Sequence, residues 1–260
     1  MSLLISNVFT YDEDAGNYIQ AVETADAQAL EPATRKAINN FVLGCKADGI
    51  WTAIKASCIL AGARTLSGAL VPLAGTAPTN FNFVAGDYNR KTGLLGDGTT
   101  KYLDSNRNNN ADPQDSKHLA VFTTVFHTRN TTRACIGSST GSIGDSHLIT
   151  AEGPARVFFR LNFTNIGQAA SLSSSATSTG LYGSSRASAA GYTGRFGGSS
   201  NFYIDTSAAP VANNITVFAR GVTSLSDARI AFYSIGESPD LALLDARVTD
   251  LINAFAVTIP

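Results

Sequence analysis

The sequence predicts a mainly β protein in which a β-sandwich core lies between helical segments at the two ends of the chain. Between residues 62 and 237, short apolar or alternating runs are separated by glycine, proline, asparagine and aspartate, which is typical of a sandwich or barrel. No helical pattern separates these runs, so no βαβ unit can be placed. With 260 residues and 44% hydrophobic content, the chain is long enough to bury a sizeable core.

The N-terminal 61 residues divide into two predicted parts. Residues 1–30 show no clear period, so we expect an arm that docks on another surface or frays. Residues 31–61 are expected to form a helical segment that packs on the core, because Pro32 stands where a helix begins and its missing N–H costs nothing. The apolar stripe at helical spacing consists of Ile38, Phe41, Val42 and Cys45. Asp48 is expected to cap a second short helix, which carries Ile50, Trp51, Ile54 and Lys55.

The C-terminal part of the chain holds two further distinctive segments. Residues 171–188 contain eight serines, which is compatible with a flexible linker or with a polar edge strand. Residues 238–260 are predicted to form an amphipathic helix after the sandwich of residues 62–237, with Ser238 as cap and Pro239 at the first helical position. Its apolar face consists of Leu241, Leu244, Val248, Leu251, Ile252 and Phe255. Such a face needs a partner surface, either the sandwich or another subunit.

The charge balance and the cysteines limit the partners and the compartment. Lys and Arg number 19 and Asp and Glu number 20, a net charge of −1, so no nucleic-acid partner is expected. No uncharged run reaches the roughly 18 residues of a membrane helix, so no membrane partner is expected. The three cysteines, Cys45, Cys58 and Cys135, suit neither a disulfide framework nor a zinc knuckle and are expected to be buried free thiols. We therefore expect a protein made in a reducing cytosol.

One motif matches a catalytic signature. Residues 137–141 are Gly-Ser-Ser-Thr-Gly, the G-x-S-x-G pattern of a nucleophile elbow. That elbow requires a strand-to-helix turn, whereas here no helical pattern follows. In a chain rich in glycine and serine such a match arises by chance. We therefore assign no catalytic residue to this motif.

A stretch rich in oxygen ligands is the candidate for a metal site. Its candidate ligands are Asp104, Asn106, Asn108, Asp112 and Asp115. Carboxylate or amide side chains fall on alternate residues, with an acid at the twelfth position, as in a calcium loop. Two positions depart from that pattern, because asparagine stands where the sharp turn needs glycine and aspartate replaces the usual glutamate. A calcium site and an ordinary Asx-rich surface turn both remain open, and no other cofactor is expected.

Three further patterns concern catalysis and sugar binding. Glycoside hydrolysis needs two acids across a cleft, and the expected carrier on a sandwich, an E-x-D-x-x-E strand, does not occur. We therefore predict that the chain is not an enzyme. His118 and His127 are nine residues apart and would face opposite sides of one strand, so a shared metal is not expected. Tyr182, Tyr192 and Tyr203 are candidates for stacking on a sugar, although sheet packing explains each equally well.

Several short stretches, taken in order, resemble a known group of proteins. They are Ala-Asp-Gly-Ile-Trp (47–51), Gly-Ala-Arg-Thr-Leu (62–66), Gly-Ala-Leu-Val-Pro-Leu (68–73), Asp-Tyr-Asn-Arg-Lys-Thr-Gly-Leu (87–94), Gly-Asp-Gly-Thr-Thr-Lys-Tyr-Leu (96–103) and Ile-Ala-Phe-Tyr-Ser-Ile-Gly (230–236). From about residue 31 to the C-terminus, the chain resembles phage and environmental-virus structural proteins with a concanavalin A-like (laminin G-like) domain. The resemblance implies a jelly-roll sandwich in a tail-fibre or other virion-surface protein, and it brings no catalytic residues.

The sequence thus leads us to expect a structural component of a phage particle, exposed on the virion as a tail fibre, tail component or capsid decoration. The expected partners are other virion proteins, further copies of the chain in a homo-oligomer, and a host-surface glycan. Because a fold does not establish sugar binding, two alternatives stay open. One is a carbohydrate-binding, lectin-like module that recognises host glycans, and the other is a glycan hydrolase.

Overall fold

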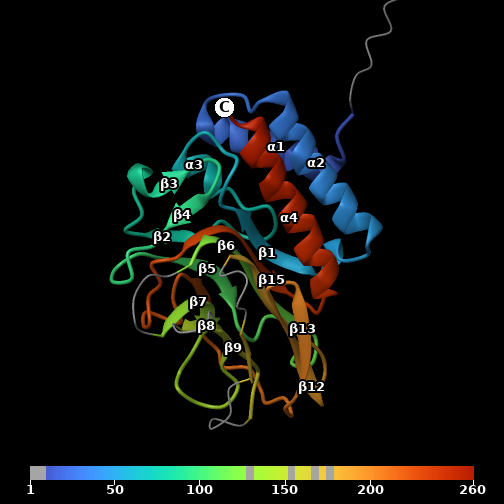
Figure 1. Ribbon diagram of the computed structural model, residues 1–260, viewed down its shortest axis with the longest axis vertical. Helices are drawn as coiled ribbons and strands as arrows, with labels where there is room; N and C mark the ends of the chain where they lie inside the picture. The colour runs from blue at the N-terminus through green and yellow to red at the C-terminus, as the bar shows by residue number, and fades with distance from the viewer. Residues whose placement is uncertain (1–9, 127–131, 152–155, 165–169, 174–178) are drawn as a thin grey trace, which may run out of the picture.

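The computed structural model describes residues 10–126, 132–151, 156–164, 170–173 and 179–260. Within this part of the chain, two antiparallel β-sheets pack face to face, and three long helices cover the outer face of one sheet (Figure 1). These helices are α1 (Glu13–Asp26), α2 (Pro32–Ala47) and α4 (Leu241–Thr258). The prediction of a mainly β sandwich with a C-terminal helix is confirmed. No helix in the described ranges combines the length and the apolar character that a membrane crossing requires.

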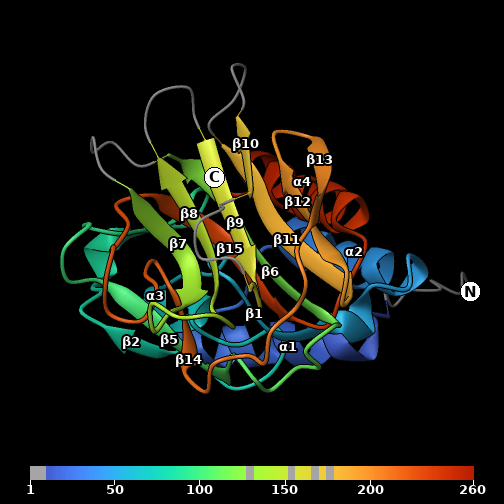
Figure 2. The ribbon, with the colours of Figure 1, turned by 90° about the horizontal axis from the view of Figure 1, so that it is seen from below.

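The two sheets differ in what covers them, and Figure 2 shows their strands as two layers. The sheet under the helices, here the helix-covered sheet, has the order β13 (Ser199–Ile204), β12 (Gly191–Phe196), β11 (Gly180–Ser188), β6 (Lys117–Val125), β15 (Arg229–Gly236), β4 (Gly93–Leu95) and β3 (Tyr88–Asn89), with β1 (Ile54–Ile59) also paired to β15. The second sheet has the order β10 (Ala170–Ser173), β9 (Arg156–Leu161), β8 (Ser146–Ala151), β7 (Arg133–Ser138), β14 (Asn214–Val217), β5 (Tyr102–Asn108) and β2 (Thr79–Phe81). A short helix, α3 (Leu66–Ala69), precedes β2.

Strand β6 shows how the three layers are held together. Its side chains alternate between two hydrophobic clusters, because successive residues of a strand face opposite sides. Leu119 and Val121 pack between the two sheets, whereas Ala120 and Phe122 pack against the helices. All four are buried, so both faces of β6 are covered. The continuous apolar run of this strand is therefore that of a strand without a solvent face.

Residues 13–26 form a helix of the core layer, which corrects the prediction of an arm over residues 1–30. Asp12 caps α1 by accepting a hydrogen bond from the Asp14 backbone N–H. The buried face of α1 consists of Ala15, Tyr18, Ile19 and Val22, together with Asp26. The Asp26 carboxylate accepts hydrogen bonds from the backbone N–H groups of Arg64 (2.6 Å) and Thr65 (2.9 Å). Helix α1 carries few apolar residues, so it is stabilised by packing against the rest of the core rather than by its own helix propensity.

Residues 54–59 form strand β1, which corrects the prediction of a second short helix within residues 31–61. The helical part of that segment ends at Ala47, and Trp51 lies in a single 3-10 turn (Trp51–Ala53). β1 pairs antiparallel with β15, with Cys58 opposite Tyr233. Both faces of β1 are largely buried, so its side chains show no alternation of apolar and polar residues. The sandwich therefore begins at Ile54 rather than at residue 62.

The serine-rich segment contributes an interior strand. β11 lies between β6 and β12, and Ser184 is fully buried, so this part is neither a linker nor an edge strand. The small residues of β11 let helix α4 approach the sheet, because a Cβ placed on Gly183 would stand 3.0 Å from Leu241 Cδ2. All six residues of the predicted apolar face of α4 are buried. The helix begins two residues later than predicted, with Asp240 rather than Ser238 as its N-cap.

Candidate functional site

The first three candidate calcium ligands lie on or at the end of a strand. Asp104, Asn106 and Asn108 belong to β5, so their alternate spacing is the period of a strand rather than that of a calcium loop. The Asp104 carboxylate accepts from the Asn106 backbone N–H (2.8 Å) and from Asn214 Nδ2 (3.2 Å). Asn106 Nδ2 donates to the Ala77 carbonyl (2.8 Å). These polar groups join β5 to its neighbouring segments.

The other two candidates are engaged elsewhere. Asp112 receives two hydrogen bonds from Arg107, at 3.0 Å from Nε and 2.5 Å from Nη2, and its side chain is almost fully buried. Asp115 accepts a hydrogen bond from the Ser207 hydroxyl. Among the described residues, no group of three His, Cys, Asp or Glu side chains is placed to hold a metal ion. The side chains of Asp104, Asn106, Asp112 and Asp115 thus contact other protein groups, and these contacts lend the calcium-loop hypothesis no support.

The serine motif of residues 137–141 lies in a hairpin between β7 and β8. The Ser139 hydroxyl donates to Asp145 Oδ2 (2.7 Å), and the Thr140 backbone N–H donates to Asp145 Oδ1 (2.9 Å). β8 follows directly, so the turn connects two strands rather than a strand and a helix. The geometry is that of a carboxylate-centred turn rather than a nucleophile elbow.

The remaining chemistry-bearing residues are packed in the interior. His118 is fully buried, and its ring nitrogens contact the Glu237 carbonyl oxygen and the Ser234 hydroxyl (2.7 Å). Burial lowers the pKa of His118 to about 4. His127 lies outside the described residues. The three cysteines are free and buried, which confirms the prediction, and burial raises the pKa of each thiol to about 12.

The three tyrosines considered for sugar stacking also serve packing. Tyr182 and Tyr192 are buried between the sheets, and the Tyr192 hydroxyl donates to the Phe159 carbonyl (2.7 Å). Tyr203 is partly buried against the same cluster, and its hydroxyl donates to the Ser171 carbonyl (3.0 Å). None of the three side chains is exposed, so the structure lends the sugar-stacking hypothesis no support at these positions.

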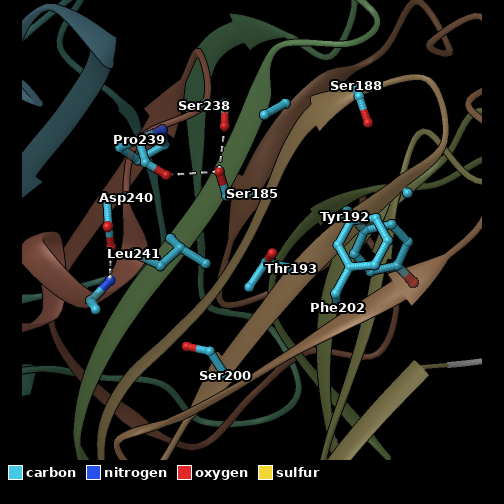
Figure 3. A pocket seen from close by; sticks show the side chains of 13 residues that line it. Ser185, Ser188, Tyr192, Thr193, Ser200, Phe202, Ser238, Pro239, Asp240 and Leu241 are labelled. Atoms are coloured by element: carbon cyan, nitrogen blue, oxygen red, sulfur yellow. Dashed lines mark hydrogen bonds between the residues drawn. The ribbon is translucent and has the colours of Figure 1, made fainter.

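A groove between the edge of the helix-covered sheet and the start of α4 has the character of a binding site (Figure 3). Its volume is about 440 Å³. Its lining includes the aromatic rings of Phe202 and of Tyr192, which is 3% exposed, and the hydroxyl-bearing side chains of Ser185, Ser188, Thr193, Ser200 and Ser238. β11, β12 and β13 supply one wall, and the segment that leads into α4 supplies the other. Concave sites with an apolar surface and a few fixed polar groups are typical of small-ligand binding.

Phe202 is the exposed aromatic residue of this groove. It lies on the edge strand β13 and is 60% exposed. Its ring lies over the backbone of the next strand at Gly191, where an added Cβ would stand 2.6 Å from Phe202 Cζ and 2.3 Å from the Tyr203 carbonyl oxygen. Glycine at position 191 is therefore required for the ring to occupy this place. Of the three tyrosines selected from the sequence, Tyr192 also lines the groove but is 3% exposed, whereas no sequence signal singled out Phe202.

The hydroxyl groups of the groove are held by both walls. The Ser185 hydroxyl bonds to the Ser238 hydroxyl (2.7 Å) and donates to the Pro239 carbonyl (2.9 Å), which ties β11 to the start of α4. Ser200 accepts a hydrogen bond from Arg195 Nη1 (3.0 Å). The guanidinium of Arg195 is in turn bound to Asp245 on α4, with Nε 2.8 Å from Oδ2. These links fix the distance between the two walls.

Helix α4 begins at the groove, opposite the aromatic ring in Figure 3. The Asp240 carboxylate accepts from the backbone N–H groups of Ala242 (2.7 Å) and Leu243 (3.3 Å). It therefore satisfies two of the amide groups that a helix leaves unpaired at its N-terminus. The groove thus has an apolar ring on one side, a carboxylate on the other, and hydroxyl groups between them.

No protein-family model matches the sequence, and a search of the curated proteins gives no match. Among solved structures, a mutant sialidase of Trypanosoma rangeli that displays trans-sialidase activity is similar, with 9% identity and a TM-score of 0.50 over 84% of this chain and 39% of that chain. The binding domain of botulinum neurotoxin serotype D has 10% identity and a TM-score of 0.48 over 76% and 51%. An arabinofuranosidase in complex with arabinofuranosyl-alpha-1,2-xylobiose has 8% identity and a TM-score of 0.45 over 62% and 40%. This chain spans about half or less of the length of each.

At these identities the similarity shows the fold, a β-sandwich, and not the activity. It nevertheless corrects the prediction that the chain is not an enzyme. A similar sandwich occurs in a sialidase, so this fold does not exclude glycosidase activity.

Proposed function

We propose that this chain is a saccharide-binding module on the surface of a phage particle, and that the groove beside α4 is its binding site. The observation that carries the proposal is the Phe202 ring, which is 60% exposed beside a surface lined by hydroxyl groups. A sugar ring has apolar C–H faces and a rim of hydroxyl groups. An aromatic ring packs on such a face, and serine and threonine hydroxyls both donate to and accept from such a rim.

The size and the rigidity of the groove support the same proposal. Its volume of about 440 Å³ lies within the range of roughly 300–1,000 Å³ that is usual for small-ligand sites. The bonds of Ser185 to the start of α4 and of Arg195 to Asp245 hold the two walls before any ligand arrives. A preformed site binds a flexible saccharide at a lower entropic cost than a site that must first close.

The proposed location on a virion has a separate basis. It rests on the ordered stretches between residues 47 and 236 that resemble phage virion-surface proteins, and on a charged content of only 15%, which suits close packing in an assembly. In this proposal other virion proteins and further copies of the chain are its partners. Mass spectrometry of purified particles tests the location, and we expect a fixed copy number per particle. Absence of the protein from purified particles would contradict the proposed location on the virion.

Binding is best tested with two variants of the same edge strand. Phe202→Ala removes the ring from the groove, whereas Ile204→Ala removes an equally apolar side chain that is 90% exposed and does not line the groove. On a panel of bacterial surface polysaccharides, we expect Phe202→Ala to weaken binding by roughly tenfold or more and Ile204→Ala to leave it unchanged. Both should unfold at the wild-type urea concentration, because both side chains are largely exposed.

Two results would contradict the binding proposal. One is that the wild-type protein binds no saccharide of the panel, and the other is that both variants lose binding to the same extent. Released sugars should be measured on the same panel, because the fold occurs in glycosidases.

A further inference from the structure

We propose that Asp240 makes the groove selective for neutral over acidic saccharides. The inference rests on the saccharide site proposed above and names the class of sugar that this site takes. Among the described residues that line the groove, Asp240 carries the single charged side chain. It is exposed, and it lies across the groove from Phe202 (Figure 3). A sugar that packs on the ring and extends toward α4 therefore meets a carboxylate.

The start of a long helix ordinarily attracts anions, because its first backbone N–H groups are unpaired and the helix dipole is positive there. α4 has 18 residues, and its N-terminus opens on the groove. Here, however, the Asp240 carboxylate already occupies the N–H groups of Ala242 and Leu243. The protein thus supplies its own anion at the position where a sugar carboxylate would otherwise bind.

The cations near the groove do not offset this charge. The Arg195 guanidinium is bound to Asp245 at 2.8 Å. Glu237, which precedes the Ser238 wall, is paired with Lys55 at 2.9 Å. Each ion pair has no net charge, so the net charge that a ligand meets in the groove is that of Asp240. Neutral hydroxyl groups are accepted by such a surface, whereas a ligand carboxylate is repelled.

The experiment uses matched pairs of probes and one isosteric variant. The probes are oligosaccharides of glucose, galactose and mannose and their uronic acid counterparts, in which a carboxylate replaces the C6 hydroxymethyl group. Asp240→Asn removes the charge and keeps the helix cap, because asparagine and aspartate are equally good N-caps. Asp250→Asn removes the same charge from an exposed position in the body of α4 and is the control.

For the wild-type protein we expect tighter binding of the neutral member of each pair, measured by calorimetry at low salt. Asp240→Asn should strengthen binding of the uronic acid member roughly three- to thirtyfold relative to the neutral member. The gain should shrink at high salt, because ions screen exposed charges. Asp250→Asn should change neither.

The possible failures are distinguishable. If no probe binds the wild-type protein, the proposed function itself fails for these sugars. If the acidic members bind the wild-type protein as tightly as the neutral members, or if Asp240→Asn leaves their ratio unchanged, the groove still binds saccharides and only the role of Asp240 is overturned. Thermal unfolding of Asp240→Asn separates a loss of binding from a loss of the folded state.

Discussion

The stretch from Asp104 to Asp115 and the groove beside α4 differ in what the protein does with their polar groups. In the stretch, carboxylates are abundant, and they accept hydrogen bonds from protein donors such as Arg107 and Asn214. In the groove, one carboxylate and several hydroxyl groups surround a ring that is 60% exposed. The number of ligating atoms in a sequence is therefore a poor guide to a ligand site. What matters is which surface remains exposed after the chain has packed.

The largest expected effect breaks the ion pair between Arg107 and Asp112 in the stretch. Arg107→Ala removes the bidentate partner of the Asp112 carboxylate, whose side chain is 1% exposed. A buried charge that loses its partner destabilises a protein by about 3 kcal/mol or more. We expect urea unfolding to show a decrease of this size in the free energy of unfolding.

Arg107→Lys is the matched control, because it keeps the charge but cannot form two parallel hydrogen bonds. Its stability should lie between those of the wild type and of Arg107→Ala. A wild-type stability for Arg107→Ala would mean that Asp112 does not depend on this pair, and the comparison with the groove would lose its basis.

A smaller effect concerns Lys117, a buried lysine two residues after the same stretch. Its Nζ donates to the Asn109 carbonyl oxygen, and burial lowers its pKa to about 7. In the unfolded chain this amine titrates near 10.4, so between pH 7 and 10.4 the unfolded state binds more protons than the folded state. The free energy of unfolding should therefore rise with pH in this window, by at most about 1.4 kcal/mol per pH unit.

The measurement is urea unfolding of wild type and Lys117→Met at several values between pH 7 and pH 8. The upper limit is needed because unfolded thiols begin to ionise near pH 8.5 while the buried ones, with a pKa of about 12, do not. Ionisation of the unfolded thiols lowers the free energy of unfolding at higher pH and so opposes the rise that Lys117 causes. An equal rise in Lys117→Met would show that another group is responsible.

The smallest expected effect is that of calcium. If the stretch held the ion in the folded state alone, added calcium would stabilise the protein in proportion to the logarithm of its concentration. We expect no shift of the unfolding midpoint on addition of millimolar calcium or of a chelator. A rise that depends on calcium concentration and disappears in Asp112→Asn would restore the calcium site and reverse the comparison.

The sequence by itself determined the elements whose side chains carry a clear period. The apolar stripes of α2 and α4 predicted buried faces, and every residue of both stripes is buried, because one face of a helix meets a core at a spacing of about 3.6 residues. The many short runs between turns predicted the sandwich for a similar reason. The spacing of the cysteines predicted free thiols, and all three are free and buried.

Tertiary structure decided the elements whose period is absent or ambiguous. β1 is covered on both faces, so its apolar run does not distinguish a strand from a helix until β15 pairs with it. β11 is rich in serine and glycine, which suggests a linker, yet it is interior because α4 packs on its small residues. The apolar face of α1 is too sparse to be recognised without its partners.

The groove depends on tertiary structure most of all. Its walls come from residues 185–202 and 238–242, which are distant in the chain and meet because α4 folds back on the sheet. A hydroxyl or a ring has no preferred role in sequence, since burial alone separates Tyr192 in the core from Phe202 on the surface. Both residues line the groove, and the packing of the tertiary structure decided which of them is exposed there.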